Sequence, residues 1–206
     1  FLMNFQGSAL VIDPDIFQVK RGIEELLDFD FNTHSLYARR GLQKNSWGSS
    51  AMLISCDQLR HWSLDDLIDR LHHGKIDYDD LINLRLEEQP IGELEKKWNE
   101  FDEINQNTIL LHTTEKITQP WRAGLKLNSS IPPLLKLIPR APLYKLFGKD
   151  LTLGREHPHE SISNFFFNEL AECIANNIVS TEELDDAVEK KYIRHDIYHK
   201  IRPFKT

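Results

Sequence analysis

The chain has 206 residues, of which 40% are hydrophobic, and its formal net charge is −7. This apolar content is sufficient for one domain with a helical appendage. The negative charge argues against nucleic-acid binding, which needs a basic surface to neutralise phosphates. No apolar run approaches the roughly 18 residues of a membrane span. The two cysteines, Cys56 and Cys173, are far apart in sequence and favour a reducing, cytoplasmic location over a disulfide scaffold.

The first expected element is a buried strand at residues 9–12, whose sequence is uniformly apolar. Asp13-Pro14-Asp15 follows it directly. Two carboxylates at the end of a buried strand are costly unless a cation lies between them, and oxygen-rich sites suit Mg²⁺ or Mn²⁺. Asp-Pro-Asp is also ordinary turn chemistry. The tripeptide alone therefore leaves a metal site and a simple turn as alternatives.

After this turn, the pattern predicts alternating helices and strands, which is typical of an α/β layered fold. Residues 28–48 are polar and irregular, and Arg39-Arg40-Gly41 within them favours a mobile loop. The other expected elements are a short helix around 23–27, a buried strand at 51–55, a helix from Ser63 to Gly74, a helix at about 78–88 and a strand at 107–111.

The last part of the chain has a different pattern. From about residue 155 the apolar residues follow helical spacing, as in the stripe that begins at Ile162, and Ser180 with Glu183 is typical of a helix cap. We therefore expect a layered α/β domain at 1–154 and a helical appendage at 155–206. The histidines of the His72-His73 and His157-Pro-His159 motifs lack metal-ligand spacing and are expected at the surface.

The segment from Lys116 to Lys149 contains no Asp or Glu. Its stretch at 131–147 is rich in proline and is both apolar and basic, with Arg140 and Lys145 among its cations. One interpretation is a loop that packs over the core with its charges in water. The other is a surface for an anionic acceptor or for peripheral membrane contact.

The order of several short motifs resembles glycosyltransferase family 8. The resemblance runs from about Ala9 to Trp121, and the order and spacing of the motifs carry it together. The main motifs are Asp13-Pro14-Asp15, Trp98-Asn99, the apolar run Thr108-Ile-Leu-Leu111 with His112 after it, and Pro120-Trp121. Two further segments resemble the family's Asn-Ser-Gly strand and its Asp-Gln-Asp segment, namely Ser46-Trp-Gly-Ser-Ser-Ala-Met-Leu53 and Tyr78-Asp-Asp-Leu-Ile-Asn83.

The resemblance implies a GT-A-like fold and a hexosyltransferase-like activity. Members of the family transfer a sugar from a nucleotide-sugar donor, usually a UDP-sugar, with retention of anomeric configuration. The implied partners are such a donor and a saccharide or glycoconjugate acceptor, and the oligomeric state is left open. Because the nucleoside-binding elements of GT-A proteins precede the Asp-x-Asp motif, we expect residues 1–154 to be the later half of a catalytic domain.

By the same resemblance, Asp13, Asp15 and His112 are the ligands of Mn²⁺ or Mg²⁺. Neighbouring parallel strands would bring these residues to one edge of the sheet. Taken alone, His112 would be read as a hydrogen-bonded histidine at a strand end. A glycoside hydrolase with a carboxylate pair is a rival hypothesis, but it needs its carboxylates on opposite sides of a sugar. The closely spaced Asp13 and Asp15 suit a shared metal better.

The remaining candidates are Asp80 as a catalytic residue, and Ser49, Ser50 and Lys116 as substrate-binding residues. Asp80 matches the second acid of the Asp-Gln-Asp segment, although a carboxylate that stabilises a helix start is nearly as good an interpretation. Ser49 and Ser50 would line the sugar pocket, while Gly48 replaces the family's asparagine.

The stretch after His112 departs from the family pattern. It lacks the glycine and lysine that contact the diphosphate and has Gln119 before Pro120. Lys116 is a candidate to supply the missing cation, because an ammonium on a flexible stem can act from a shifted position. The departure also favours an alternative hypothesis, a non-catalytic glycosyltransferase-like binding or scaffold domain.

Overall fold

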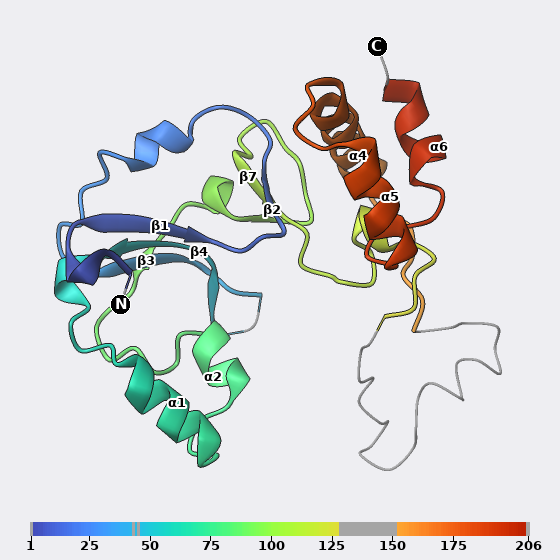
Figure 1. Ribbon diagram of the computed structural model, residues 1–206. Helices are drawn as coiled ribbons and strands as arrows, with labels where there is room; N and C mark the ends of the chain where they lie inside the picture. Colours follow the sequence, from blue (N-terminus) through green and yellow to red (C-terminus); the bar gives the residue numbers. More distant parts are fainter. Residues whose placement is uncertain (1, 43, 45, 128–151, 205–206) are drawn as a thin grey trace. The chain divides into compact units, whose positions relative to one another are not determined.

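The computed structural model describes residues 2–42, 44, 46–127 and 152–204. The expected apolar and basic stretch at 131–147 lies outside these residues. Sheets and helices together form an α/β fold (Figure 1), and the chain divides into two compact units, Phe1–His112 and Thr113–Thr206. The expected boundary between a catalytic part and an appendage at 154/155 stays a prediction, because a packing unit need not coincide with a functional one. Each unit is described by itself.

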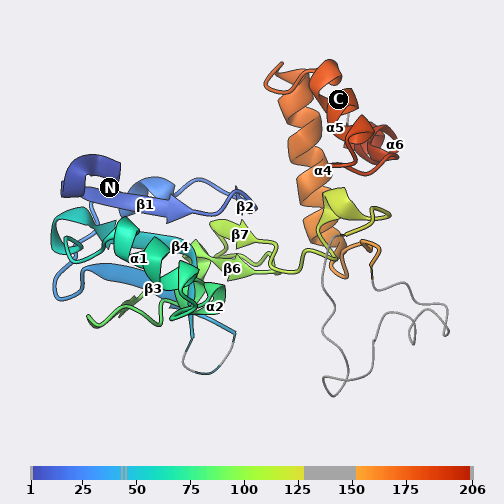
Figure 2. The same cartoon turned by 60° about the horizontal axis from the view of Figure 1, so that its bottom comes forward.

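The first unit contains a four-stranded sheet with the order β1-β4-β3-β5, and Figure 2 shows the strands β1, β4 and β3 of this sheet. Both β1 and β3 are antiparallel to β4, whereas β5 is parallel to β3. The strands are β1 (Ser8–Ile12), β3 (Leu36–Arg40), β4 (Trp47–Ser55) and β5 (Gly92–Glu93).

Strand β1 lies at an edge of this sheet, and the expectation of a buried strand is wrong. Val11 and Ile12 are 37% and 44% exposed. Within the described residues β1 pairs with β4 alone, so its other edge has no neighbouring strand to cover it. An apolar run predicts a strand but does not tell how many strands will flank it.

Strand β3 replaces the loop expected at 28–48. Leu36 and Ala38 are fully buried, while Tyr37 and Arg39 between and after them are half-buried. This alternation with period two is the pattern of a strand that presents one face to the core. The polar residues on either side of the segment obscured this short alternation.

A second sheet of three strands has the order β2-β7-β6. Its strands are β2 (Ile16–Gln18), β6 (Glu100–Phe101) and β7 (Leu110–His112). Strand β2 is antiparallel to β7, and β6 is parallel to it. Leu110 and Leu111 of β7 are almost completely buried, so this strand anchors the second sheet in the core of the unit.

The helices of the first unit follow local signals in the sequence. Ser63 caps α1 by accepting a hydrogen bond from the backbone N–H of Asp66, and Gly74 follows the helix with φ +63°. The second helix is shorter than the expected 78–88, because Leu84 adopts a positive φ of 52°. These helices are η1 (Leu2–Phe5), η2 (Ile23–Leu26), η3 (Cys56–Gln58), α1 (Leu64–His72), α2 (Tyr78–Ile82) and η4 (Lys96–Trp98).

The second unit is helical from Glu160 onward, as the sequence predicts. Ser180 and Glu183 form the expected reciprocal cap of α5. Its helices are η5 (Pro120–Arg122), α4 (Glu160–Ala175), α5 (Thr181–Glu189), α6 (Ile197–Ile201) and η6 (Arg202–Phe204), and its core contains Phe167, Ala171, Leu184, Ile197 and Ile201. His157 is 6% exposed, so the expectation that it lies at the surface is wrong.

Among the described residues, no helix combines the length and apolar character needed to cross a membrane. Cys56 and Cys173 are both free thiols.

Candidate metal centre and adjoining cavity

Asp13-Pro14-Asp15 forms the turn between β1 and β2. The backbone N–H of Asp13 donates to the carbonyl of Ser50 at 2.8 Å, and the N–H of Ile16 donates to the carbonyl of Asp13 at 3.1 Å. The first bond ties the turn to β4, and the second closes the turn on itself. The tripeptide is therefore a turn whose backbone holds two carboxylates in defined positions.

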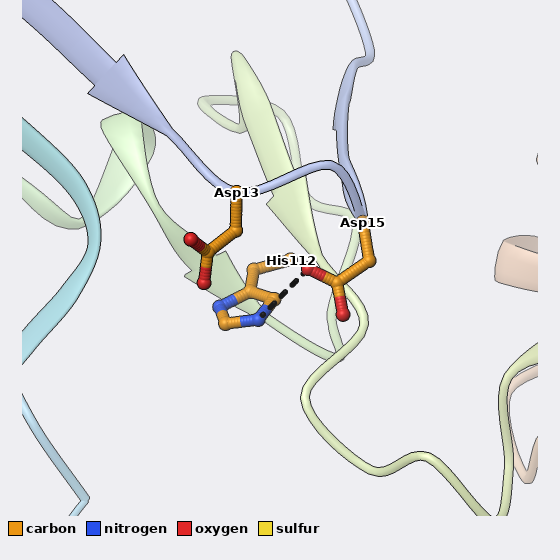
Figure 3. Close-up of side chains that lie close together, drawn as sticks. All are labelled: Asp13, Asp15 and His112. Carbon is orange, nitrogen blue, oxygen red and sulfur yellow. Dashed lines mark ion pairs between the residues drawn. The ribbon is translucent and has the colours of Figure 1, made fainter. Parts of the chain in front are cut away.

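Strand pairing places His112 beside this turn. His112 pairs with Ile16 in the antiparallel register of β7 and β2, so Asp15 lies next to it. The Nε2 atom of His112 is 3.7 Å from Oδ1 of Asp15. Potential ligand atoms of Asp13, Asp15 and His112 all lie within 4.8 Å of one another, and Figure 3 shows both carboxylates near the imidazole ring.

The structure thus brings the three expected ligands together, but for a different reason than the one expected. Parallel strands do not create this arrangement, since β1 with β4 and β2 with β7 are antiparallel pairs. The turn leads from the first sheet into the second, and His112 ends the strand that pairs with β2. Metal binding by these residues stays a prediction.

Burial and mutual charge determine the protonation of this cluster. Burial raises the pKa of Asp13, and the negative charge of Asp15 raises it further, while His112 acts in the opposite direction. Burial lowers the pKa of His112, against the attraction of Asp15 and Asp13 for its charged form. The neutral imidazole is therefore favoured, and this is the form that ligates metals.

The residues present fit a divalent cation. The Nδ1 atom of His112 is buried and has no hydrogen-bond partner among the described residues, which is costly for a polar atom. Two carboxylates and one imidazole form a mixed oxygen and nitrogen donor set that suits Mn²⁺. A cation held by this set would also reduce the repulsion between Asp13 and Asp15.

A group of residues behind His112 supports its ring. Phe101 packs edge-on against the imidazole with ring centroids 5.6 Å apart, and the guanidinium of Arg39 lies 3.9 Å from the centroid of the Phe101 ring. Arg39 also forms an ion pair with Glu100 at 3.2 Å and donates to the carbonyl of Asn99. Sequence reasoning missed the roles of Arg39, Glu100 and Phe101, for which the short alternation in β3 was the available signal.

The predicted substrate-binding serines have different positions. Ser49 lines a cavity of about 530 Å³ together with Asp13 and Asp80. Ser50 is 6% exposed, and its hydroxyl accepts a hydrogen bond from Nδ2 of Asn99 at 3.0 Å. Ser50 therefore supports the turn and Asn99, and a direct contact between Ser50 and a sugar stays a prediction.

Asp80 has a structural role in addition to its place on the cavity. Its carboxylate accepts from the backbone N–H of Asp77 at 3.1 Å and from Arg85 at 3.2 Å, which completes the cap of α2. The hydrogen bond from the Asp77 backbone and the one from Arg85 lower the pKa of Asp80. This supports the interpretation of a helix cap, and a catalytic role for Asp80 stays a prediction.

The stretch after His112 belongs to the second unit. Lys116 is exposed there, and its expected contribution to the donor site stays a prediction. Gln119 is 2% exposed, and its Nε2 donates to the carbonyl of Thr113 at 3.1 Å. Gln119 stands where the family that the sequence resembles has a phosphate-contacting lysine. Its side chain is buried and forms an internal hydrogen bond.

No family model and no curated protein matches the chain. Among solved structures, it is similar to the apo form of the glycosyltransferase GlyE from Streptococcus pneumoniae TIGR4, with 17% identity over 61% of this chain and 36% of that one and a TM-score of 0.47. It is also similar to an active-site variant of LgtC, with 15% identity over 55% of this chain and 55% of that one and a TM-score of 0.43. The galactosyltransferase LgtC with donor and acceptor sugar analogues gives 13% identity, 55% of this chain and 54% of that one, and a TM-score of 0.41. The chain spans from about a third to about half of the length of these structures.

Proposed function

We propose that this chain carries the metal site of a glycosyltransferase that uses a nucleotide-sugar donor. The observation that supports this proposal best is that ligand atoms of Asp13, Asp15 and His112 lie within 4.8 Å of one another, and that the buried Nδ1 of His112 has no hydrogen-bond partner in the part of the chain that the structure describes. The motif order adds the finer features, which are a UDP-sugar donor, a saccharide or glycoconjugate acceptor and retention of configuration.

Each member of the cluster has a definite task in this mechanism. Asp13 and Asp15 supply anionic oxygens, and His112 supplies a neutral nitrogen. A divalent cation bound to them would offset the negative charge that develops on the diphosphate leaving group. The backbone bond from Asp13 to Ser50 and the packing of Phe101 on His112 keep these donors in place before the substrate arrives.

The cavity that begins at Asp13 gives the reacting sugar a place beside the cluster. Ser49 and Asp80, which the motif resemblance assigns to the sugar site, both line this cavity. We assign the orientation of the donor sugar to Ser49. Asp80 would act next to the sugar while it continues to cap α2.

A non-catalytic binding or scaffold domain is the alternative, and one observation favours it. Gln119 replaces a phosphate-contacting lysine, and its amide nitrogen is already bonded to the carbonyl of Thr113. The missing cation would weaken the binding of the diphosphate. A protein of this kind would bind a nucleotide sugar without turnover.

Donor hydrolysis separates the two functions. With Mn²⁺ present, the protein should slowly release UDP from UDP-glucose or UDP-galactose. Asp15→Ala should reduce this rate roughly 100-fold or more, because the leaving group loses much of its charge compensation. Asp28→Ala, which removes an exposed carboxylate elsewhere in the same unit, should leave the rate unchanged.

Undiminished hydrolysis by Asp15→Ala would exclude the proposed mechanism. A wild-type protein that binds UDP-sugars but releases no UDP from any of them would support the non-catalytic alternative.

A further inference from the structure

The cavity beside Asp13 is larger and more apolar than a binding site for a single sugar needs to be. Its volume of about 530 Å³ falls within the range of cavities that hold drug-sized ligands. Most of its lining surface is apolar, and this surface is supplied by Val11, Met52, Trp62, Leu67, Leu81 and Leu84. All of these residues belong to the first unit.

The polar side chains of the cavity wall are mostly paired with one another. The carboxylate of Glu87, whose side chain is 2% exposed, accepts from Nε1 of Trp62 at 2.6 Å and lies 3.2 Å from Nε2 of His61. Asp66 pairs with Arg70 at 3.5 Å, one turn along α1. The buried carboxylate of Glu87 is thus occupied by its own partners, whereas Asp66 and Arg70 are exposed to solvent.

Within the described residues, the hydroxyl of Ser49 and the carboxylates of Asp13 and Glu88 form no side-chain hydrogen bond, although all three residues line the cavity. Asp13 belongs to the candidate metal cluster, and Glu88 is exposed to solvent. The cavity therefore offers the hydroxyl of Ser49 beside the cluster and mainly apolar surface over the rest of the wall. A ligand that matches it has a short hydroxyl-bearing part joined to an apolar part.

The charge of the wall excludes the nucleotide as the occupant of the apolar part. Acidic residues outnumber basic ones along the wall, where Asp66, Glu87 and Glu88 accompany Arg70. A phosphate-bearing group would be repelled at this surface, whereas an uncharged group would not. The hydrogen bond to Glu87 also fixes the indole of Trp62, which gives an aromatic or alkyl group a preorganised surface to contact.

We propose that this cavity binds the acceptor, and that the acceptor is a glycoside with an uncharged apolar aglycone, either aryl or alkyl. The sugar of the acceptor lies next to the donor sugar that Ser49 orients, and its aglycone packs against Trp62 and Leu67 farther along the wall. The assignment of the ligand as an acceptor rests on the proposed function. The preference for an apolar aglycone rests on the cavity wall alone.

Binding of two simple probes tests this preference. Octyl β-D-glucopyranoside below its micelle concentration should bind at least tenfold more tightly than methyl β-D-glucopyranoside, because only the octyl chain reaches the apolar wall. Leu67→Ser should remove most of this difference. Leu64→Ser is the matched control, since Leu64 lies on the same helix, is 49% exposed and does not line the cavity.

A photoreactive benzophenone glucoside provides a second measurement that does not depend on any variant. Its label should be found in peptides that contain Val11 or residues 49–88. Equal affinity for the octyl and methyl glucosides would overturn the inference. Equal loss of octyl binding in both leucine variants, or labelling outside these peptides, would also overturn it by indicating non-specific adsorption.

Failure of the proposed function gives a different result. The probes bind without donor or metal, and Asp15→Ala should retain octyl binding because Asp15 does not line the cavity. Octyl selectivity without any donor hydrolysis would refute the proposed transferase activity but would still support a glycoside-binding site in the cavity.

In an active protein, the octyl glycoside should accelerate UDP release at a lower concentration than the methyl glycoside. Identical concentration dependence for the two glycosides would refute only the assignment of the ligand as an acceptor.

Discussion

Two neighbouring arginines have very different environments in this protein. Arg39 forms an ion pair with Glu100 in which both side chains are 11% exposed, and it stacks on Phe101 behind His112. Arg40 is 55% exposed, and its ion pair with Glu93 reaches 3.5 Å at the surface. The buried side chain of Arg39 therefore supports the metal cluster through its contact with Phe101, which packs on His112. The side chain of Arg40 lies mainly in solvent.

We predict that Arg39→Ala lowers the free energy of unfolding by about 3 kcal/mol, because it leaves the buried carboxylate of Glu100 without a cation and with only the amide of Asn105 as a side-chain hydrogen-bond donor. Arg40→Ala should cost at most about 1 kcal/mol, as is usual for an exposed ion pair. Urea unfolding of both variants measures the difference.

The double variant Arg39→Met with Glu100→Gln is the control for this interpretation. It removes both charges and should recover part of the lost stability. Equal losses in Arg39→Ala and Arg40→Ala, or a double variant less stable than Arg39→Ala, would contradict the account of a buried ion pair.

At the scale of elements, Arg194 joins three separate segments of the second unit. Its guanidinium binds both carboxylate oxygens of Glu156 at 2.9 and 2.7 Å, and it also contacts Asp196 at the start of α6. It further donates to the carbonyl of Pro120 in η5 at 3.2 Å. The side chain of Arg194 is 5% exposed, so this network holds the segment that precedes α4 through a buried side chain.

This network makes the second unit sensitive to acid. Hydrogen bonding to Arg194 lowers the pKa of Glu156 from 4.5 to about 2. Because the pKa is lowered by folding, the stabilisation is complete above about pH 4.5 and is lost as the pH falls toward 2. Hydrogen exchange in α4, measured by mass spectrometry, should accelerate over this range.

Glu156→Gln should weaken protection in α4 at neutral pH and reduce its dependence on pH between about 4.5 and 2. If α4 in the wild-type protein and in Glu156→Gln lost protection along identical pH curves, other carboxylates would be responsible.

Local signals predicted the helices better than the strands. Ser63, Gly74 and the pair Ser180 and Glu183 mark helix ends through contacts within a few residues, and the structure contains each of these caps. Strand β3 was missed, because its alternation is short and polar residues surround it. The exposure of β1 depends on which strands lie beside it, and this is a non-local property that no local pattern records.

For the molecule as a whole, the α/β fold and the grouping of the metal-ligand candidates could be predicted, but the reason for the grouping could not. Residue type and motif order singled out Asp13, Asp15 and His112. The antiparallel register that pairs His112 with Ile16 links segments far apart in sequence, so it became visible only in the structure. The same applies to the cavity, which residues from β1, β4, α1 and α2 form together.

The central claim is that these three residues hold a divalent cation for a nucleotide-sugar donor. Its most direct test is a Mn²⁺ titration in the presence of UDP, followed by the electron paramagnetic resonance signal of free Mn²⁺. We predict one saturable site in the wild-type protein and in Asp28→Ala, and at least tenfold weaker binding in Asp13→Ala, Asp15→Ala and His112→Ala. The absence of a saturable site, or an affinity that none of the three ligand substitutions changes, would contradict the claim.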